Sequence, residues 1–147
     1  MSLRTKLEED IRDAMRARDE VKRDTLRMVV ASVKQAEIDL GRDMTDDEVL
    51  KVLATARKTR VEAAEQFDAA GRADLAAIER EQLVVVVGYL PQQMNADELR
   101  TVVQELIAEL GASSPQDKGS VMKALMGRHK GLVDGKAAQQ ILGELLS

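Results

Sequence analysis

The chain has 147 residues, of which 44% are hydrophobic and 33% are charged, and its formal net charge is −4. This balance is typical of one globular domain or two small ones and excludes a disordered chain, while the absence of cysteine excludes disulfides, thiolate metal sites and cysteine nucleophiles. The N-terminus does not resemble a signal peptide and no apolar run is long enough to span a membrane, so we expect a cytoplasmic protein without membrane contact.

The first 41 residues predict two amphipathic helices. The first carries apolar residues at intervals of four, which predicts a single apolar stripe made of Leu3, Leu7, Ile11 and Met15. The second runs from Glu20 to about Leu40 and has an apolar face made of Leu26, Val29, Val30, Val33 and Ala36. Gly41 follows and is placed to end this helix in the left-handed conformation.

A third helix is predicted to begin after Thr45. Thr45 and Glu48 have the spacing of a capping box, in which the Thr hydroxyl accepts from a free amide and the Glu carboxylate reaches back to the cap. Apolar residues at helical spacing then continue to about Ala70, and Gly71 ends the helix.

The segment from Ala73 to Tyr89 is predicted to be a fourth helix. The stripe that supports it consists of Leu75, Ile78, Leu83 and Val86. The four successive residues Val84–Val87 would favour a strand if they stood alone. No second strand-like run exists to pair with them, so we predict helix, with a local break near Gly88 as the alternative.

Pro91 marks the boundary between two predicted helical subdomains, residues 1–90 and 91–147, because the residue before a proline avoids helical dihedrals. Three helices are predicted after it. The first begins at an Asn95 cap and closes at Gly111, the second follows Ser114-Pro115 and ends at Gly127, and the last is capped by Asp134. The predicted fold is therefore all-α and multihelical, with about four helices followed by a three-helix module.

No side chains form a recognisable catalytic, metal or cofactor site, so the predicted catalytic residues, metals and cofactors are none. The single histidine, His129, lies between cations in a glycine-rich loop, where a surface role is favoured over a general base. The acidic runs Glu8–Asp10 and Asp46–Glu48 lie near predicted helix starts, where negative charge complements the helix dipole.

Positive charge is concentrated near the C-terminus. Residues 112–136 contain five basic side chains against two acidic ones, whereas the rest of the chain contains 17 against 24. Glycines among these cations would let a polyanion approach the backbone closely. The candidate nucleic-acid-binding residues are Lys118, Gly119, Lys123, Arg128, Lys130, Gly131 and Lys136. The alternative is that Gly127, Gly131 and Gly135 only terminate helices around a tight corner.

Several segments in order along the chain resemble the GatB/YqeY family. The C-terminal segment Lys118–Met126, followed by Gly131 and Asp134–Lys136, resembles a signature that YqeY-like proteins share with the tail of the B subunit of the tRNA-dependent amidotransferase. The other segments that carry the resemblance are Thr25–Met28, Lys34–Asp39, Arg60, Glu65–Leu75 and Tyr89–Gln93.

The resemblance implies an all-α protein with an N-terminal helical subdomain and a C-terminal three-helix module that helps to hold tRNA. The catalytic parts of the amidotransferase lie outside its tail and have no counterpart in this chain. We therefore expect a tRNA-binding accessory module associated with amidotransfer.

Two other functions stay open. One is a protein-interaction module that docks on an amidotransferase or an aminoacyl-tRNA synthetase through the Val84–Val87 face and the Met-rich short helix. The other is a carbon–nitrogen ligase with glutamine as the amide donor, which rests on the family association alone.

Overall fold

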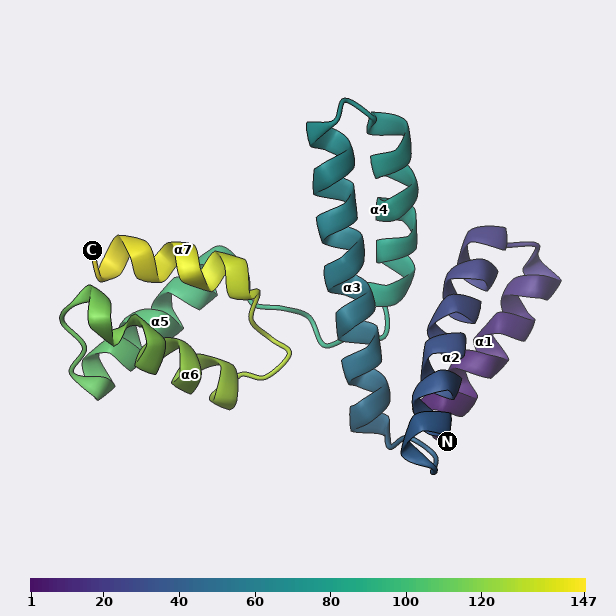
Figure 1. The fold of residues 1–147 in the computed structure, drawn as a ribbon, viewed down its shortest axis with the longest axis horizontal. Helices are drawn as coiled ribbons and strands as arrows, with labels where there is room; N and C mark the ends of the chain where they lie inside the picture. Colours follow the sequence, from purple (N-terminus) through teal and green to yellow (C-terminus); the bar gives the residue numbers. More distant parts are fainter. The chain divides into compact units, whose positions relative to one another are not determined.

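The computed structural model describes residues 1–147 and consists of helices and loops without any strand (Figure 1). In chain order the elements are α1 (Leu3–Ala17), α2 (Glu20–Leu40), α3 (Asp46–Ala69), α4 (Ala73–Val87), α5 (Ala96–Leu110), the 3-10 helix η1 (Pro115–Asp117), α6 (Lys118–Arg128) and α7 (Gly135–Leu145). The all-α prediction is confirmed. No helix combines the length and the apolar character that a membrane crossing requires.

The chain divides into two compact units, Met1–Leu90 and Pro91–Ser147, and each has its own apolar core. In the N-terminal unit α1 and α2 form one hairpin and α3 and α4 form another, and α2 also packs against both α3 and α4 (Figure 1). In the C-terminal unit α5 packs against α6 and α7, which also contact each other.

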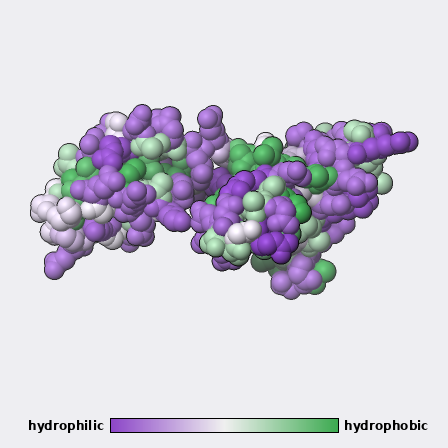
Figure 2. All heavy atoms as spheres, turned by 90° about the horizontal axis from the view of Figure 1, so that it is seen from above, coloured by the Kyte–Doolittle hydropathy of each residue, from purple (hydrophilic) through white to green (hydrophobic).

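Both cores are aliphatic. Buried leucine and valine from α1, α2, α3 and α4 fill the first, and buried leucine, valine, isoleucine and alanine fill the second. Hydrophilic side chains cover most of the face seen in Figure 2, with apolar side chains in smaller patches. The helices therefore form because each buries one apolar stripe and leaves the remainder of its surface polar.

The stripe predicted for α1 differs from the one that is buried. Leu7 and Ala14 are buried, whereas Met15 is 50% exposed. A spacing of four advances about 40° around a helix at each step, so a row that begins at Leu3 has rotated by about 120° when it reaches Met15. The prediction for Met15 was wrong because Ala14, seven residues after Leu7, stays on the core side.

The valine run belongs to the end of α4. Val86 is fully buried and Val85 packs against the N-terminal core, whereas Val84 and Val87 are exposed. The helical prediction is confirmed, and Gly88 follows as the C-cap in a right-handed conformation. Ile78, which the predicted stripe placed on the core side, is 50% exposed, and Ala76 is buried instead.

Acidic residues from both predicted runs have structural partners. Asp46 accepts a hydrogen bond from the backbone N–H of Leu3 at 2.9 Å, and Asp10 accepts one from the hydroxyl of Tyr89. The Thr45–Glu48 capping box is present at the start of α3. The helix-start prediction holds for Asp46–Glu48, which forms the first turn of α3, but it was wrong for Glu8–Asp10, which lies inside α1, whose first turn has no acidic residue.

A buried carboxylate joins three segments of the N-terminal unit. Glu37 on α2 is 9% exposed and accepts hydrogen bonds from the guanidinium of Arg4 on α1 at 2.9 Å and from the backbone N–H of Met44 at 2.8 Å. Met44 lies in the loop between α2 and α3. The three segments are therefore fixed to one charge that is itself satisfied.

The ends of the C-terminal helices differ slightly from the predicted ones. Asn95 and Asp134 cap α5 and α7, as expected, and Gly111 ends α5 with a φ of 65°. However, α6 continues through Gly127 to Arg128, and Gly135 is the first residue of α7 rather than a terminator.

The Glu48 carboxylate makes the start of α3 sensitive to acid. Hydrogen bonds from Arg42 and from the Thr45 backbone lower the pKa of Glu48 from 4.5 to about 2. Because the pKa is lowered on folding, the stabilisation is complete above about pH 4.5 and is lost as the pH falls towards about 2. We expect Glu48→Gln, which keeps the cap but removes the charge, to lose less stability over this range, as measured by urea unfolding at several pH values.

Asp47→Asn is the matched control because it removes a charge from the same helix end without touching Arg42. If both variants change the acid dependence equally, the Arg42–Glu48 pair is not its source.

Candidate nucleic-acid interface in the C-terminal unit

The seven predicted site residues lie on two helices and the loop between them. Lys118 is the first residue of α6, which also carries Gly119, Lys123 and Arg128. Lys130 and Gly131 belong to the loop, and Lys136 is the second residue of α7.

The structure brings one part of this set together and separates the other. Arg128, Lys130, Gly131 and Lys136 surround the corner between α6 and α7, since the loop that joins the two helices is only six residues long. Lys118 begins α6, ten residues and about 15 Å of helix rise away from Arg128. The cations therefore form a corner cluster and a separate group along α6.

The three cations of α6 also point in different directions around its axis. Val121 and Leu125 are fully buried and define the core side. At about 100° per residue, Lys123 lies opposite that side, whereas Lys118 and Arg128 lie closer to it on either flank. Only Lys123 stands at the centre of the solvent face.

Most side chains on the solvent face of α6 are short. The face carries Lys123 and three small exposed residues, Gly119, Ser120 and Gly127, with Met126, 39% exposed, at one edge. A methyl group added to either glycine would meet no atom within 4 Å, so the space in front of the helix is open. A rigid polyanion could approach this face to within reach of both the backbone and the Lys123 ammonium. We name Gly119, Ser120, Lys123 and Gly127 the α6 outer face.

Arg128 is already paired. Its two terminal nitrogens donate to the two carboxylate oxygens of Glu109 on α5 at 2.7 and 2.8 Å. The Arg128 hydrogen bonds lower the pKa of Glu109, and the same pair raises the pKa of Arg128. Both side chains are about half exposed, so the pair is of the surface type. A phosphate would have to compete with Glu109 for this guanidinium.

Lys118, Lys123 and Lys130 make no ion pair with a carboxylate of the chain. Lys123 and Lys130 are exposed, and Lys118 is partly exposed. The backbone N–H of Lys136 donates to its helix cap, Asp134, at 3.2 Å. Three of the five predicted cations are thus available without breaking a salt bridge.

Backbone hydrogen bonds hold the α6–α7 corner. The backbone N–H of Leu132 donates to the carbonyl of His129 at 3.0 Å, and the Leu132 carbonyl accepts from the N–H of Met94 at 2.7 Å. Gly131 lies between these residues with a φ of 78°, a conformation that costs an L-residue roughly 1–2 kcal/mol. The fold itself therefore explains Gly131.

The sequence identified the cations, but two other residues of the site were missed: Glu109, which pairs with Arg128, and Ser120, which lies on the same side of α6 as Lys123. Glu109 lies 19 residues from Arg128, and no local pattern connects them. Ser120 could have been found, because it shares the outward side of a helix with Gly119, Lys123 and Gly127 when the apolar residues define the inward side.

Comparison with known proteins places the whole chain in one family. The model of the YqeY-like protein family matches residues 4–146. The chain is 28% identical over 127 residues to "Altered inheritance of mitochondria protein 41, mitochondrial" of Clavispora lusitaniae, which covers 84% of this chain and 74% of that protein.

Proteins of the same name from Meyerozyma guilliermondii and Lachancea thermotolerans are 29% and 30% identical to the chain. The matches cover 82% and 74% of this chain, but 63% and 60% of those proteins. The chain thus spans less than two thirds of these two relatives. Because the family match extends over nearly every residue, the chain belongs to the YqeY-like family.

Proposed function

We propose that this chain is a tRNA-binding accessory protein associated with tRNA-dependent amidotransfer, and that its α6 outer face contacts the sugar-phosphate backbone. The observation that carries this proposal is the pair of glycines beside Lys123. Neither Gly119 nor Gly127 has a positive φ, and at neither position would an added Cβ meet another part of the protein within 4 Å.

These two glycines are unfavourable for the helix that contains them. In a helix interior, glycine is roughly 0.5–1 kcal/mol less stable than alanine because it loses more backbone entropy on folding, and Gly119 and Gly127, each one residue from an end of α6, carry part of this cost. The fold gains nothing in return at either position, since alanine would fit both. A bound backbone that needs close approach gives these glycines a role that packing does not.

The lysines supply charge, and the composition of the unit indicates which part of an RNA they meet. Lys118, Lys123 and Lys130 can neutralise phosphates without losing a carboxylate partner. The two aromatic residues of the chain, Phe67 and Tyr89, both lie before residue 91. Without aromatic platforms for splayed bases, the C-terminal unit is suited to the backbone and shape of a folded RNA.

The association with amidotransfer is supported by family resemblance. The C-terminal module is similar to the tail of the amidotransferase B subunit, and the α6 segment carries most of the shared signature. The role proposed for this chain is therefore to hold tRNA, while a partner enzyme performs the chemistry.

Removal of a single lysine should change the salt dependence of binding. For Lys123→Gln we expect weaker binding to folded tRNA and a decrease of about one in the slope of log affinity against log salt, because one phosphate contact is lost. Filter binding at several salt concentrations measures this slope. Lys58→Gln, on α3, removes the same charge from the other unit and should leave the slope unchanged. No saturable binding by the wild type at low salt would refute the proposal.

Release of Arg128 should strengthen binding. In Glu109→Gln the guanidinium loses its carboxylate partner and becomes available to a phosphate, so we expect higher affinity and a salt slope steeper by about one. Glu105→Gln removes the same charge from the same helix without affecting Arg128. An equal gain in both variants would show that only net charge has changed.

Alanine on the α6 outer face should separate stability from binding. We expect Gly127→Ala to keep or raise the unfolding free energy, by up to about 1 kcal/mol, while tRNA affinity falls because the added methyl group holds the backbone away. Gly143→Ala on α7 is the matched control, since its site is equally open. If Gly127→Ala binds tRNA as tightly as the control, close approach to α6 is not required.

A further inference from the structure

Two ionisable side chains are buried in the N-terminal unit, and only one of them has an opposite charge beside it. Glu37 is paired with Arg4, as described above. Arg60 on α3 is 7% exposed and forms no salt bridge. Its terminal nitrogens donate to the Ala56 carbonyl at 3.2 Å and to the sulfur of Met28 at 3.8 Å. Its Nε is buried without any hydrogen-bond partner.

This arrangement is unfavourable for a protein that binds nothing at Arg60. A guanidinium stays protonated under all physiological conditions, so burial cannot be relieved by loss of the charge. A buried charge is normally paired or fully hydrogen-bonded, and a thioether is a weak acceptor. The surroundings of Arg60 therefore lack an anion.

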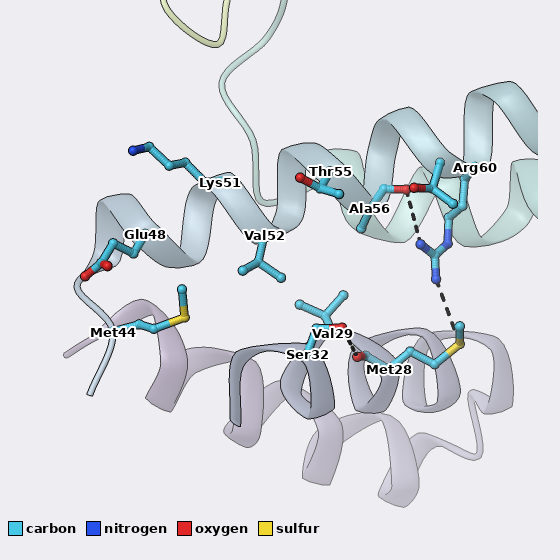
Figure 3. Close-up of a pocket in the computed structure, with 11 residues that line it drawn as sticks. Met28, Val29, Ser32, Met44, Glu48, Lys51, Val52, Thr55, Ala56 and Arg60 are labelled. Atoms are coloured by element: carbon cyan, nitrogen blue, oxygen red, sulfur yellow. Dashed lines mark hydrogen bonds between the residues drawn. The ribbon is translucent and has the colours of Figure 1, made fainter. Parts of the chain in front are cut away.

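A groove of about 530 Å³ between α2 and α3 leads to Arg60 (Figure 3). On α3 its wall includes Val52, Ala56 and Arg60, which recur at intervals of four, and Val29 on α2 faces them. Glu48 continues the same row at the other end, but Arg42 and the helix cap already occupy its carboxylate. Ser32, Thr55 and Thr59 add hydroxyl groups to the wall, and the groove is otherwise apolar and ends at one uncompensated cation.

The charges of this groove select the kind of ligand. Lys51 also lines the groove, but it lies nine residues and about 14 Å of helix rise from Arg60, and its side chain points away from α2 in Figure 3. A phosphate or a dianion would meet a single cation. A monocarboxylate matches one guanidinium in charge and in the bidentate geometry that arginine favours. The apolar wall favours a ligand whose remaining part is hydrocarbon.

We infer that the α2–α3 groove binds an organic monocarboxylate with an apolar chain, whose carboxylate pairs with Arg60 and whose chain lies along Val52 and Ala56. Met28 is 53% exposed, so its side chain can move away and yield its position beside Arg60 to the carboxylate. The site is in the N-terminal unit and does not depend on the proposed binding of tRNA.

Decanoate, below its micellar concentration, is a suitable probe. We expect it to shift the Arg60 Nε–H resonance in a ¹⁵N–¹H spectrum of the full chain and to raise the thermal unfolding midpoint saturably. Decanol should bind at least about tenfold more weakly because it has no charge to pair with the guanidinium. Acetate should bind at least about tenfold more weakly because it has no chain to bury along Val52 and Ala56.

Arg60→Met tests whether the guanidinium is the binding group. We expect the variant to fold, because an unpaired buried charge is costly and methionine replaces it with an apolar side chain, and to bind decanoate at least about tenfold more weakly. Arg27→Met, which removes an exposed arginine from α2, is the control and should bind like the wild type. Equal binding of decanoate and decanol, unchanged affinity in Arg60→Met, or no shift of the Arg60 resonance would each overturn the inference.

Discussion

The carboxylate of Glu37 is the interaction on which the arrangement of α1, α2 and the α2–α3 loop depends. It holds Arg4 from one side and the Met44 backbone from another, so the loop leaves α2 in a fixed direction. Met44 in turn lines the groove that ends at Arg60. Glu37 therefore positions the end of the groove that lies opposite Arg60 (Figure 3).

The two units use similar residues for different purposes. In the N-terminal unit, Gly41 and Gly71 have positive φ and serve the turns that end α2 and α3. In the C-terminal unit, Gly131 does the same at the α6–α7 corner, but Gly119 and Gly127 have ordinary helical conformations and open surroundings. The conformational freedom of glycine explains the first group. For the second group the absence of a side chain is the relevant property.

Local signals in the sequence were sufficient for most helix ends. Thr45, Asn95 and Asp134 each accept a backbone hydrogen bond at the start of the helix that they were expected to cap, because capping involves residues only two or three positions apart. The burial of Met15 and Ile78 was not predicted correctly, since a slow rotation of the apolar stripe decides it. The valine run showed how tertiary context overrides intrinsic strand preference.

The sequence predicted which residues belong to the candidate site, but it did not predict how their side chains are arranged. The cations near the C-terminus could be read directly, but their directions around α6 depend on which side Val121 and Leu125 bury. Arg128 and Glu109 lie on different helices, 19 residues apart, so no rule of residue spacing predicts their pairing. The sequence did not predict that Arg60 lacks an ion-pair partner either, because that depends on which carboxylates the tertiary structure places near it.

The contact between Tyr89 and Asp10 has a spectroscopic consequence. Tyr89 is the only tyrosine and the chain has no tryptophan, so near-ultraviolet absorbance and fluorescence arise almost entirely from one phenol ring. The hydroxyl of that ring donates a hydrogen bond to Asp10 on α1, and the ring packs against the N-terminal core. Intrinsic emission consequently reports on the contact between α1 and the segment that follows α4. The last 57 residues give no such signal unless a fluorophore is introduced there.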